Sequence, residues 1–162
     1  SPQLCRLAPM CSRHERCALC VLRVFVVKSM SRELRFPDGF LWGVATAAHQ
    51  NEGMNVHNDV WAWEQAGNHT ADGTVSGRAA DWWNRAEEDF DRAADLGLNS
   101  LRLSIEWSRI EPESGEFSNV ALDHYRRMCG ACQELGLEPI VTFHHFPTPR
   151  WVAARAGGRV DQ

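Results

Sequence analysis

Apolar runs alternate along the chain with amphipathic segments. Residues 40–50 form an apolar, small-residue stretch that follows a Pro-Asp-Gly turn and ends in polar residues, which is typical of a buried strand. Residues 99–107 alternate strictly and predict a second strand, with leucines on one face and Arg102 on the other. Residues 138–145 place an apolar body before two histidines and predict a third strand.

Two amphipathic segments lie between the predicted strands. Over residues 80–96, apolar and small residues recur at steps of three and four, which predicts a helix. The residues expected on its inner face are Trp83, Ala86, Phe90, Ala93 and Ala94. Residues 120–135 predict a second helix, with Ser118 as its N-cap. Residues 51–80 show no sustained period, so we interpret them as a long loop, and such loops in compact domains tend to serve a site.

The order strand, helix, strand, helix, strand favours right-handed βαβ units in a parallel α/β sheet. Polar residues gather at the carboxyl ends of the predicted strands: His49, Gln50, Glu52, Glu106, Arg109, His144 and His145. In a (β/α)8 barrel, that rim is where active sites are built. We therefore expect a partial (β/α)8 TIM barrel, made of about its first three βα units.

The composition is that of a globular chain able to bury a core, with 162 residues, 44% hydrophobic residues and seven tryptophans. The net charge of −4 argues against a nucleic-acid partner. No apolar run reaches the roughly 18 to 20 residues that span a bilayer, which argues against a membrane protein. We expect a cytoplasmic location, with secretion left open, and free thiols at Cys129 and Cys132 on a helix.

The opening stretch, residues 1–29, differs in composition from the rest. It carries five basic residues against one acidic residue, a net charge of +4, together with four of the six cysteines. A secretory signal is one interpretation, but Arg23 interrupts its apolar run and no clear cleavage site follows. A zinc site at Cys17 and Cys20 lacks the second close ligand pair. We favour a non-native or disordered leader at 1–29, followed by one truncated domain at 30–162.

Three segments together carry a resemblance to a known family. Residues 36–53 read FPDGFLWGVATAAHQNEG, residues 98–112 read LNSLRLSIEWSRIEP, and residues 138–149 read EPIVTFHHFPTP. The first closely resembles the N-terminal signature of family 1 glycoside hydrolases, and the other two resemble that family's second and third strand patterns. All three occur in the family's order. The resemblance implies a β-glucosidase-like enzyme that hydrolyses O-glycosidic bonds of small or oligosaccharide β-glycosides without a metal or organic cofactor.

The resemblance also implies roles for four residues. Gln50 and His145 match residues that contact the sugar of the non-reducing subsite, and an amide both donates and accepts hydrogen bonds. Phe146 occupies the place of a common tryptophan, which keeps aromatic packing and loses the indole donor. Arg102 matches an arginine that holds the nucleophilic carboxylate ionised.

Plain structural explanations compete with these roles. Gln50 could satisfy backbone groups at a strand end, and Arg102 alone would be a charged strand face. His144 and His145 are adjacent on a predicted strand and point to opposite faces, which makes joint metal ligation unfavourable.

The catalytic residues of the family are not found in the sequence. Retaining glycosidases use two carboxyl groups about 5 to 5.5 Å apart. The family places them in an Asn-Glu-Pro and a Glu-Asn-Gly motif after its fourth and seventh strands, and neither motif occurs here. We therefore expect a fragment that is inactive by itself. A non-catalytic carbohydrate-binding protein, an inert truncated protein, and enzymes for β-galactosides, β-fucosides or 6-phosphosugars are the alternatives.

Overall fold

The computed structural model describes residues 34–67 and 69–155, and the expectation for residues 1–29 lies outside them. The chain divides into two compact units, Ser1–Phe40 and Leu41–Gln162. In the described part of the first unit, the Phe40 amide donates to the Pro37 carbonyl at 3.1 Å and closes a turn. The rings of Phe36 and Phe40 lie 4.7 Å apart. Among the described residues, no helix combines the length and apolar character needed to cross a membrane.

The second unit is built on a parallel sheet of three strands in the order β1-β2-β3. The strands are β1 (Gly43–Ala45), β2 (Ser100–Ser104) and β3 (Glu138–Thr142). The parallel pairing confirms the predicted topology. Each strand is shorter than its predicted segment, because the chain turns into short helices and loops at the carboxyl ends.

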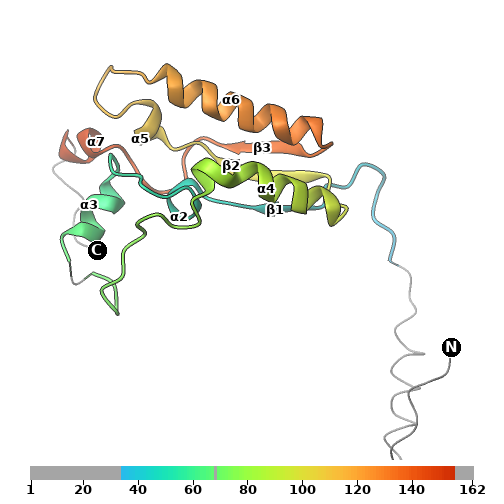
Figure 1. Cartoon of the computed structure of the whole chain (residues 1–162), viewed down its shortest axis with the longest axis horizontal. Helices are drawn as coiled ribbons and strands as arrows, with labels where there is room; N and C mark the ends of the chain where they lie inside the picture. Colours follow the sequence, from blue (N-terminus) through green and yellow to red (C-terminus); the bar gives the residue numbers. More distant parts are fainter. Residues whose placement is uncertain (1–33, 68, 156–162) are drawn as a thin grey trace, which may run out of the picture. The chain divides into compact units, whose positions relative to one another are not determined.

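Two long helices, α4 (Trp82–Asp95) and α6 (Asn119–Glu134), follow β1 and β2 along the chain and pack on the sheet (Figure 1). The Ser118 hydroxyl accepts from the Ala121 amide at 3.2 Å, so the predicted N-cap is confirmed. The buried core between helices and sheet consists of Trp82, Ala86, Phe90, Ala93, Leu101, Leu103, Tyr125, Met128, Cys132 and Leu137. Cys129 and Cys132 are free thiols on α6, as expected, and burial raises the pKa of both.

The inner face of α4 differs from the prediction at two positions: Trp82 takes the place of Trp83, and Ala94 is only partly buried and is not part of the core. Trp82 is 1% exposed and meets Phe90 edge to ring at 5.7 Å, so it fills the core. Trp83 is only partly buried, at the border of the core. Trp82 lies one helical step of four residues before Ala86, on the same buried stripe of α4, whereas the predicted pattern began at Trp83.

The strand face opposite the helices is the face that carries Arg102. The register pairs Arg102 with Ala45 of β1 and with Ile140 of β3, which places these three residues on one face. Ile140 is 43% exposed. This face is therefore open within the part of the chain that the structure describes.

Four short helices lie beyond the carboxyl ends of the strands (Figure 1). They are α2 (Ala48–Asn51), α3 (Asp59–Gln65), α5 (Trp107–Ile110) and α7 (Arg150–Arg155). The sequence predicted a strand up to residue 50 and an unbroken loop over 51–80, and both expectations are wrong in part.

Side chains from elsewhere in the fold explain the first two of these helices. The Ser104 hydroxyl accepts from the Ala48 amide at 2.6 Å, and Asn51 accepts from the Ala47 amide at 3.0 Å, so α2 begins there. Asn58 caps α3 by accepting from the Trp61 amide at 2.7 Å.

Candidate functional site

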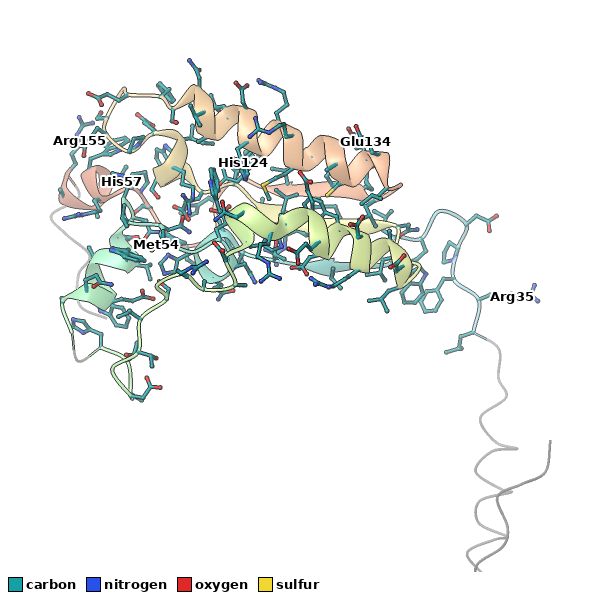
Figure 2. All side chains as sticks on the ribbon, in the orientation of Figure 1. Arg35, Met54, His57, His124, Glu134 and Arg155 are labelled. Atoms are coloured by element: carbon teal, nitrogen blue, oxygen red, sulfur yellow. The ribbon has the colours of Figure 1, made fainter. Side chains whose placement is uncertain are left out.

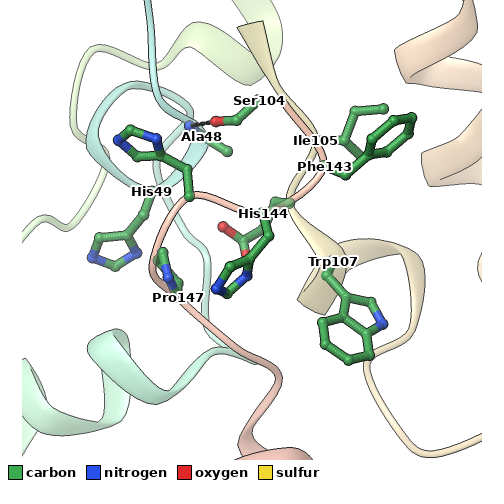
Figure 3. A pocket seen from close by; sticks show the side chains of 10 residues that line it. Ala48, His49, Ser104, Ile105, Trp107, Phe143, His144 and Pro147 are labelled. Atoms are coloured by element: carbon green, nitrogen blue, oxygen red, sulfur yellow. Dashed lines mark hydrogen bonds between the residues drawn. The ribbon is translucent and has the colours of Figure 1, made fainter. Parts of the chain in front are cut away.

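A hollow opens at the carboxyl ends of the three strands (Figure 3). It encloses about 230 Å³, including space open to solvent. The residues that line it come from α2, the end of β2 and the segment after β3: Ala48, His49, Ser104, Ile105, Glu106, Trp107, Phe143, His144, His145 and Pro147. Four of the seven residues predicted at the rim line this hollow, namely His49, Glu106, His144 and His145.

Arg102 and His145 meet at this rim. Arg102 Nη1 lies 3.3 Å from His145 Nδ1, and both side chains are partly buried. A guanidinium can only donate, so Nδ1 is the acceptor in this contact, which corresponds to the tautomer with its proton on Nε2. The main chain of Arg102 is held as well, because its carbonyl accepts from the Thr46 amide at 2.8 Å. The pair thus leaves Nε2–H of His145 as a hydrogen-bond donor.

Phe146 follows His145 in an unusual backbone conformation. Its φ is +73°, in the left-handed region that non-glycine residues rarely adopt. The side chain is 72% exposed, and its ring meets the His145 ring at 4.9 Å. Gln50 lies on α2, is exposed and is not among the residues that line the hollow. Sugar binding by Gln50 stays a prediction.

His49, the neighbour of Gln50, is buried and fixed from two sides. Asn58 Nδ2 donates to His49 Nδ1 at 3.0 Å, and His49 Nε2 lies 3.3 Å from Glu64 Oε1. Glu64 also accepts from the amide and the hydroxyl of Ser76, at 3.0 and 2.6 Å. Burial raises the pKa of Glu64, but the bonds from Ser76 and His49 outweigh burial and leave that pKa below its ordinary value.

Glu106 is the buried carboxylate of the hollow. It is 3% exposed, and its Oε1 accepts from the Ser108 hydroxyl at 2.7 Å at the start of α5. Its amide donates to the Tyr125 hydroxyl at 3.0 Å. The Glu106 carboxylate therefore caps the N-terminus of α5, and the residue also lines the hollow.

Glu52 and Arg109 were predicted at the rim, but they pair away from the hollow. Glu52 is 1% exposed and accepts from Arg109 Nε and from the Tyr125 hydroxyl, both at 2.8 Å. Burial raises the pKa of Glu52 to about 7 against the opposing effects of Arg109 and Tyr125. The Arg109 guanidinium lies 4.1 Å from the Trp83 ring centre. His124, which is labelled in Figure 2, stacks on the same ring at 3.9 Å.

Comparison with known proteins identifies the family. The sequence model of glycosyl hydrolase family 1 matches residues 32–162. The chain belongs to this family. Family 1 membership and the parallel sheet together show that β1, β2 and β3 with their helices are part of a (β/α)8 barrel.

The curated relatives of this chain include β-glucosidases. Beta-glucosidase A of Thermotoga maritima is 35% identical over 129 residues, which cover 76% of this chain and 29% of that protein. The bifunctional β-D-glucosidase/β-D-fucosidase of Bifidobacterium breve is 35% identical over 135 residues, with 78% and 29% covered. The chain thus spans about 29% of the length of these curated relatives.

Solved family 1 structures agree with this assignment. The family 1 β-glucosidase from Thermotoga maritima superposes with a TM-score of 0.73 at 34% identity, covering 76% of this chain and 29% of that one. The β-glycosidase from Pyrococcus horikoshii gives 0.70 at 41% identity, covering 77% and 29%.

The structure brings some of the sequence-predicted family 1 residues together and not others. Arg102, His145 and Phe146 form one connected group, and Gln50 lies on the neighbouring helix outside the hollow. His49 and Glu106 line the hollow, although no specific role was predicted for either residue. Their polar positions after strands were the only available signal. Within residues 34–67 and 69–155, no group of three His, Cys, Asp or Glu side chains is arranged to hold a metal ion.

Proposed function

We propose that this chain forms the sugar-binding part of the active site of a retaining β-glycosidase that prefers β-glucosides. The observation that carries the proposal is the contact between Arg102 and His145 at the rim. It supports the assignment because it occupies one ring nitrogen of His145 and leaves the other to donate, in a residue that lines the hollow where barrel enzymes bind substrate. The names of the relatives, Beta-glucosidase A among them, support the substrate class.

Each predicted residue takes a chemical role in this proposal. His145 donates from Nε2 to a hydroxyl of the sugar, and Phe146 packs its exposed ring against the apolar face of the sugar. Gln50 turns from its exposed position on α2 to donate to one hydroxyl and accept from another. Arg102 is a fixed cation that favours the ionised form of a nearby carboxylate, as a nucleophile requires.

The two reacting carboxyl groups belong, in this proposal, to later strands of the barrel. Double displacement needs an acid/base and a nucleophile about 5 to 5.5 Å apart. The sequence has no Asn-Glu-Pro and no Glu-Asn-Gly motif, and Glu106, the carboxylate in the hollow, is occupied by its bond to Ser108. The 162 residues by themselves therefore bind the sugar weakly or not at all and hydrolyse nothing.

The test uses the full-length product of the reading frame and 4-nitrophenyl β-D-glucoside. We expect hydrolysis with retention at the anomeric carbon, followed by proton NMR. His145→Ala should lower kcat/KM at least about tenfold, because it removes one hydrogen bond and a ring contact in the transition state. His57→Ala is the matched control, since His57 is an exposed histidine outside the hollow.

Several outcomes would contradict the proposal. A full-length product that hydrolyses no β-glycoside, or one that inverts the anomeric configuration, would overturn the reaction. Equal kcat/KM for His145→Ala and wild type would overturn the role of the rim. Activity of the 162-residue chain alone would overturn the assignment of the two carboxyl groups to later strands.

β-Fucosides are a second candidate substrate, because one relative is named a bifunctional β-D-glucosidase/β-D-fucosidase. A β-fucoside differs from a β-glucoside in part by a missing hydroxyl, so comparison of the two 4-nitrophenyl glycosides decides between them. The Thermotoga maritima enzyme has been solved in complex with castanospermine. We propose that the same compound occupies the hollow of the full-length product here, which makes it a probe of sugar binding.

A further inference from the structure

The segment that carries His145 and Phe146 is held in a conformation that it would not adopt alone. A φ of +73° at a residue with a large side chain is a local strain, and such strain persists only where neighbouring contacts impose it. The ring of Phe146 cannot supply these contacts, because the side chain is 72% exposed. Contacts of the other residues therefore hold the segment, and the contact between Arg102 and His145 is one of them.

Asp59 supplies contacts of this kind from the segment after β1. Its carboxylate accepts from the Thr148 amide at 2.9 Å through Oδ1 and from the Thr148 hydroxyl at 3.1 Å through Oδ2. The Asp59 amide donates in turn to the Thr148 carbonyl at 2.9 Å. Three hydrogen bonds thus join two residues that are 89 positions apart in the sequence. An isolated antiparallel bridge between Asn58 and Pro149 continues this junction.

The contacts of Asn58 and Asp59 with Thr148 and Pro149 are also connected to α2, on the other side of the hollow. Asn58 is fully buried, and it donates to His49 of α2 while its Oδ1 caps α3. His49 lines the hollow and precedes Gln50 directly. The pair Asn58 and Asp59 therefore connects α2, which carries Gln50, to the segment that carries His145 and Phe146.

We propose that Asp59 is a positioning residue for sugar binding. It fixes the segment after β3 through Thr148, and it thereby sets the distance between the Gln50 side and the His145 side of the hollow. Asp59 does not touch the sugar. The inference rests on the proposed β-glycosidase function, and it adds a residue to which the sequence assigned no role.

The test measures KM and kcat of the full-length product with 4-nitrophenyl β-D-glucoside. Asp59→Ala removes both side-chain hydrogen bonds to Thr148 and should raise KM about tenfold, the size expected for losing charge-assisted bonds that hold binding groups in place. The expected change in kcat is smaller, because the reacting carboxyl groups lie elsewhere. Asp59→Asn retains an acceptor for the Thr148 amide and a partner for its hydroxyl, so it should restore most of the affinity.

Asp72→Ala is the matched control. Asp72 accepts from the amide and the hydroxyl of Thr74, at 3.0 and 2.7 Å, which is the same pair of bonds made within an exposed loop. This variant should leave KM unchanged. Thermal unfolding of all variants separates positioning from loss of folded protein.

The inference and the proposed function fail in different ways. An inactive wild type contradicts the function. An active wild type whose Asp59→Ala variant keeps its KM contradicts the positioning role. The role is also overturned if Asp59→Asn is as impaired as Asp59→Ala, or if only the apparent kcat falls, in proportion to the folded fraction, while KM stays unchanged.

Discussion

Replacing Glu52 by glutamine should change how the stability of the protein depends on pH. Burial raises the pKa of this carboxyl from its ordinary value of 4.5 to about 7. Between these pH values the folded state keeps a proton that the unfolded state has released, so the stability contributed by the neutral acid is present below pH 4.5 and is lost as pH rises to 7. At about 1.4 kcal/mol for each pH unit, the loss amounts to about 3 kcal/mol.

Urea unfolding of the full-length product at a series of pH values measures this effect. Glutamine resembles the neutral acid in shape and does not titrate, so the free energy of unfolding of Glu52→Gln should decline less than that of the wild type, by about 3 kcal/mol over this interval. Glu88→Gln is the control, because Glu88 is an exposed partner of Arg85 and Arg92, and this variant should keep the wild-type decline.

A wild type that gains stability relative to Glu52→Gln as pH rises from 4.5 to 7 would refute the reasoning. That result would mean that Arg109, whose Nε is 2.8 Å from the carboxylate, holds Glu52 ionised in spite of its burial.

Three further predictions concern stability. Gly53→Ala should destabilise the full-length product by about 3 kcal/mol in denaturant unfolding, because φ is +81° and a Cβ would lie 2.0 Å from the Arg78 carbonyl oxygen. Gly97→Ala, with φ of +77° and nothing within 4 Å, should cost only about 1 kcal/mol, and equal costs would contradict this account. Phe90→Ala, at a fully buried site, should cost about 3 to 5 kcal/mol by the same assay. The 162-residue chain alone should show no sharp, reversible thermal transition by circular dichroism, because β1 and β3 are unpaired edges among the described strands.

The sequence predicted the long elements of the fold because their patterns are local. Helix α4 shows its apolar residues at helical steps, and Ser118 marks the start of α6 with a cap that the structure contains. The strict alternation around Arg102 likewise predicted β2 and the direction of its two faces. Each signal depends on residues a few positions apart, so a single sequence is sufficient to detect it.

The short helices could not be predicted in the same way. Helix α2 begins where the Ser104 hydroxyl, 56 positions away in the sequence, accepts a hydrogen bond from the Ala48 amide. The apolar residues around Ala48 contain no pattern from which this hydrogen bond could be predicted. Helix α3 has a cap signal in Asn58, but seven residues are too few to show a helical period.

The residues of the candidate site were likewise predictable where a local motif marks them and not predictable where a long-range contact places them. The resemblance of short motifs supplied Arg102 and His145, and the structure brings them together. No sequence pattern connects Asp59 with Thr148, because their hydrogen bond forms only when β1 and β3 bring the segments that follow them to the same edge of the sheet. Glu52 was expected at the rim because it follows β1, but its carboxylate is buried and accepts from the Tyr125 hydroxyl of α6.

A crystal structure of the full-length product with castanospermine tests the central claim most directly. The account predicts the inhibitor in the hollow, with one hydroxyl within hydrogen-bond distance of His145 Nε2 and another within reach of the Gln50 amide. Castanospermine bound at another place, or bound in the hollow without contact to either side chain, would contradict the claim that this part of the family 1 barrel binds the sugar.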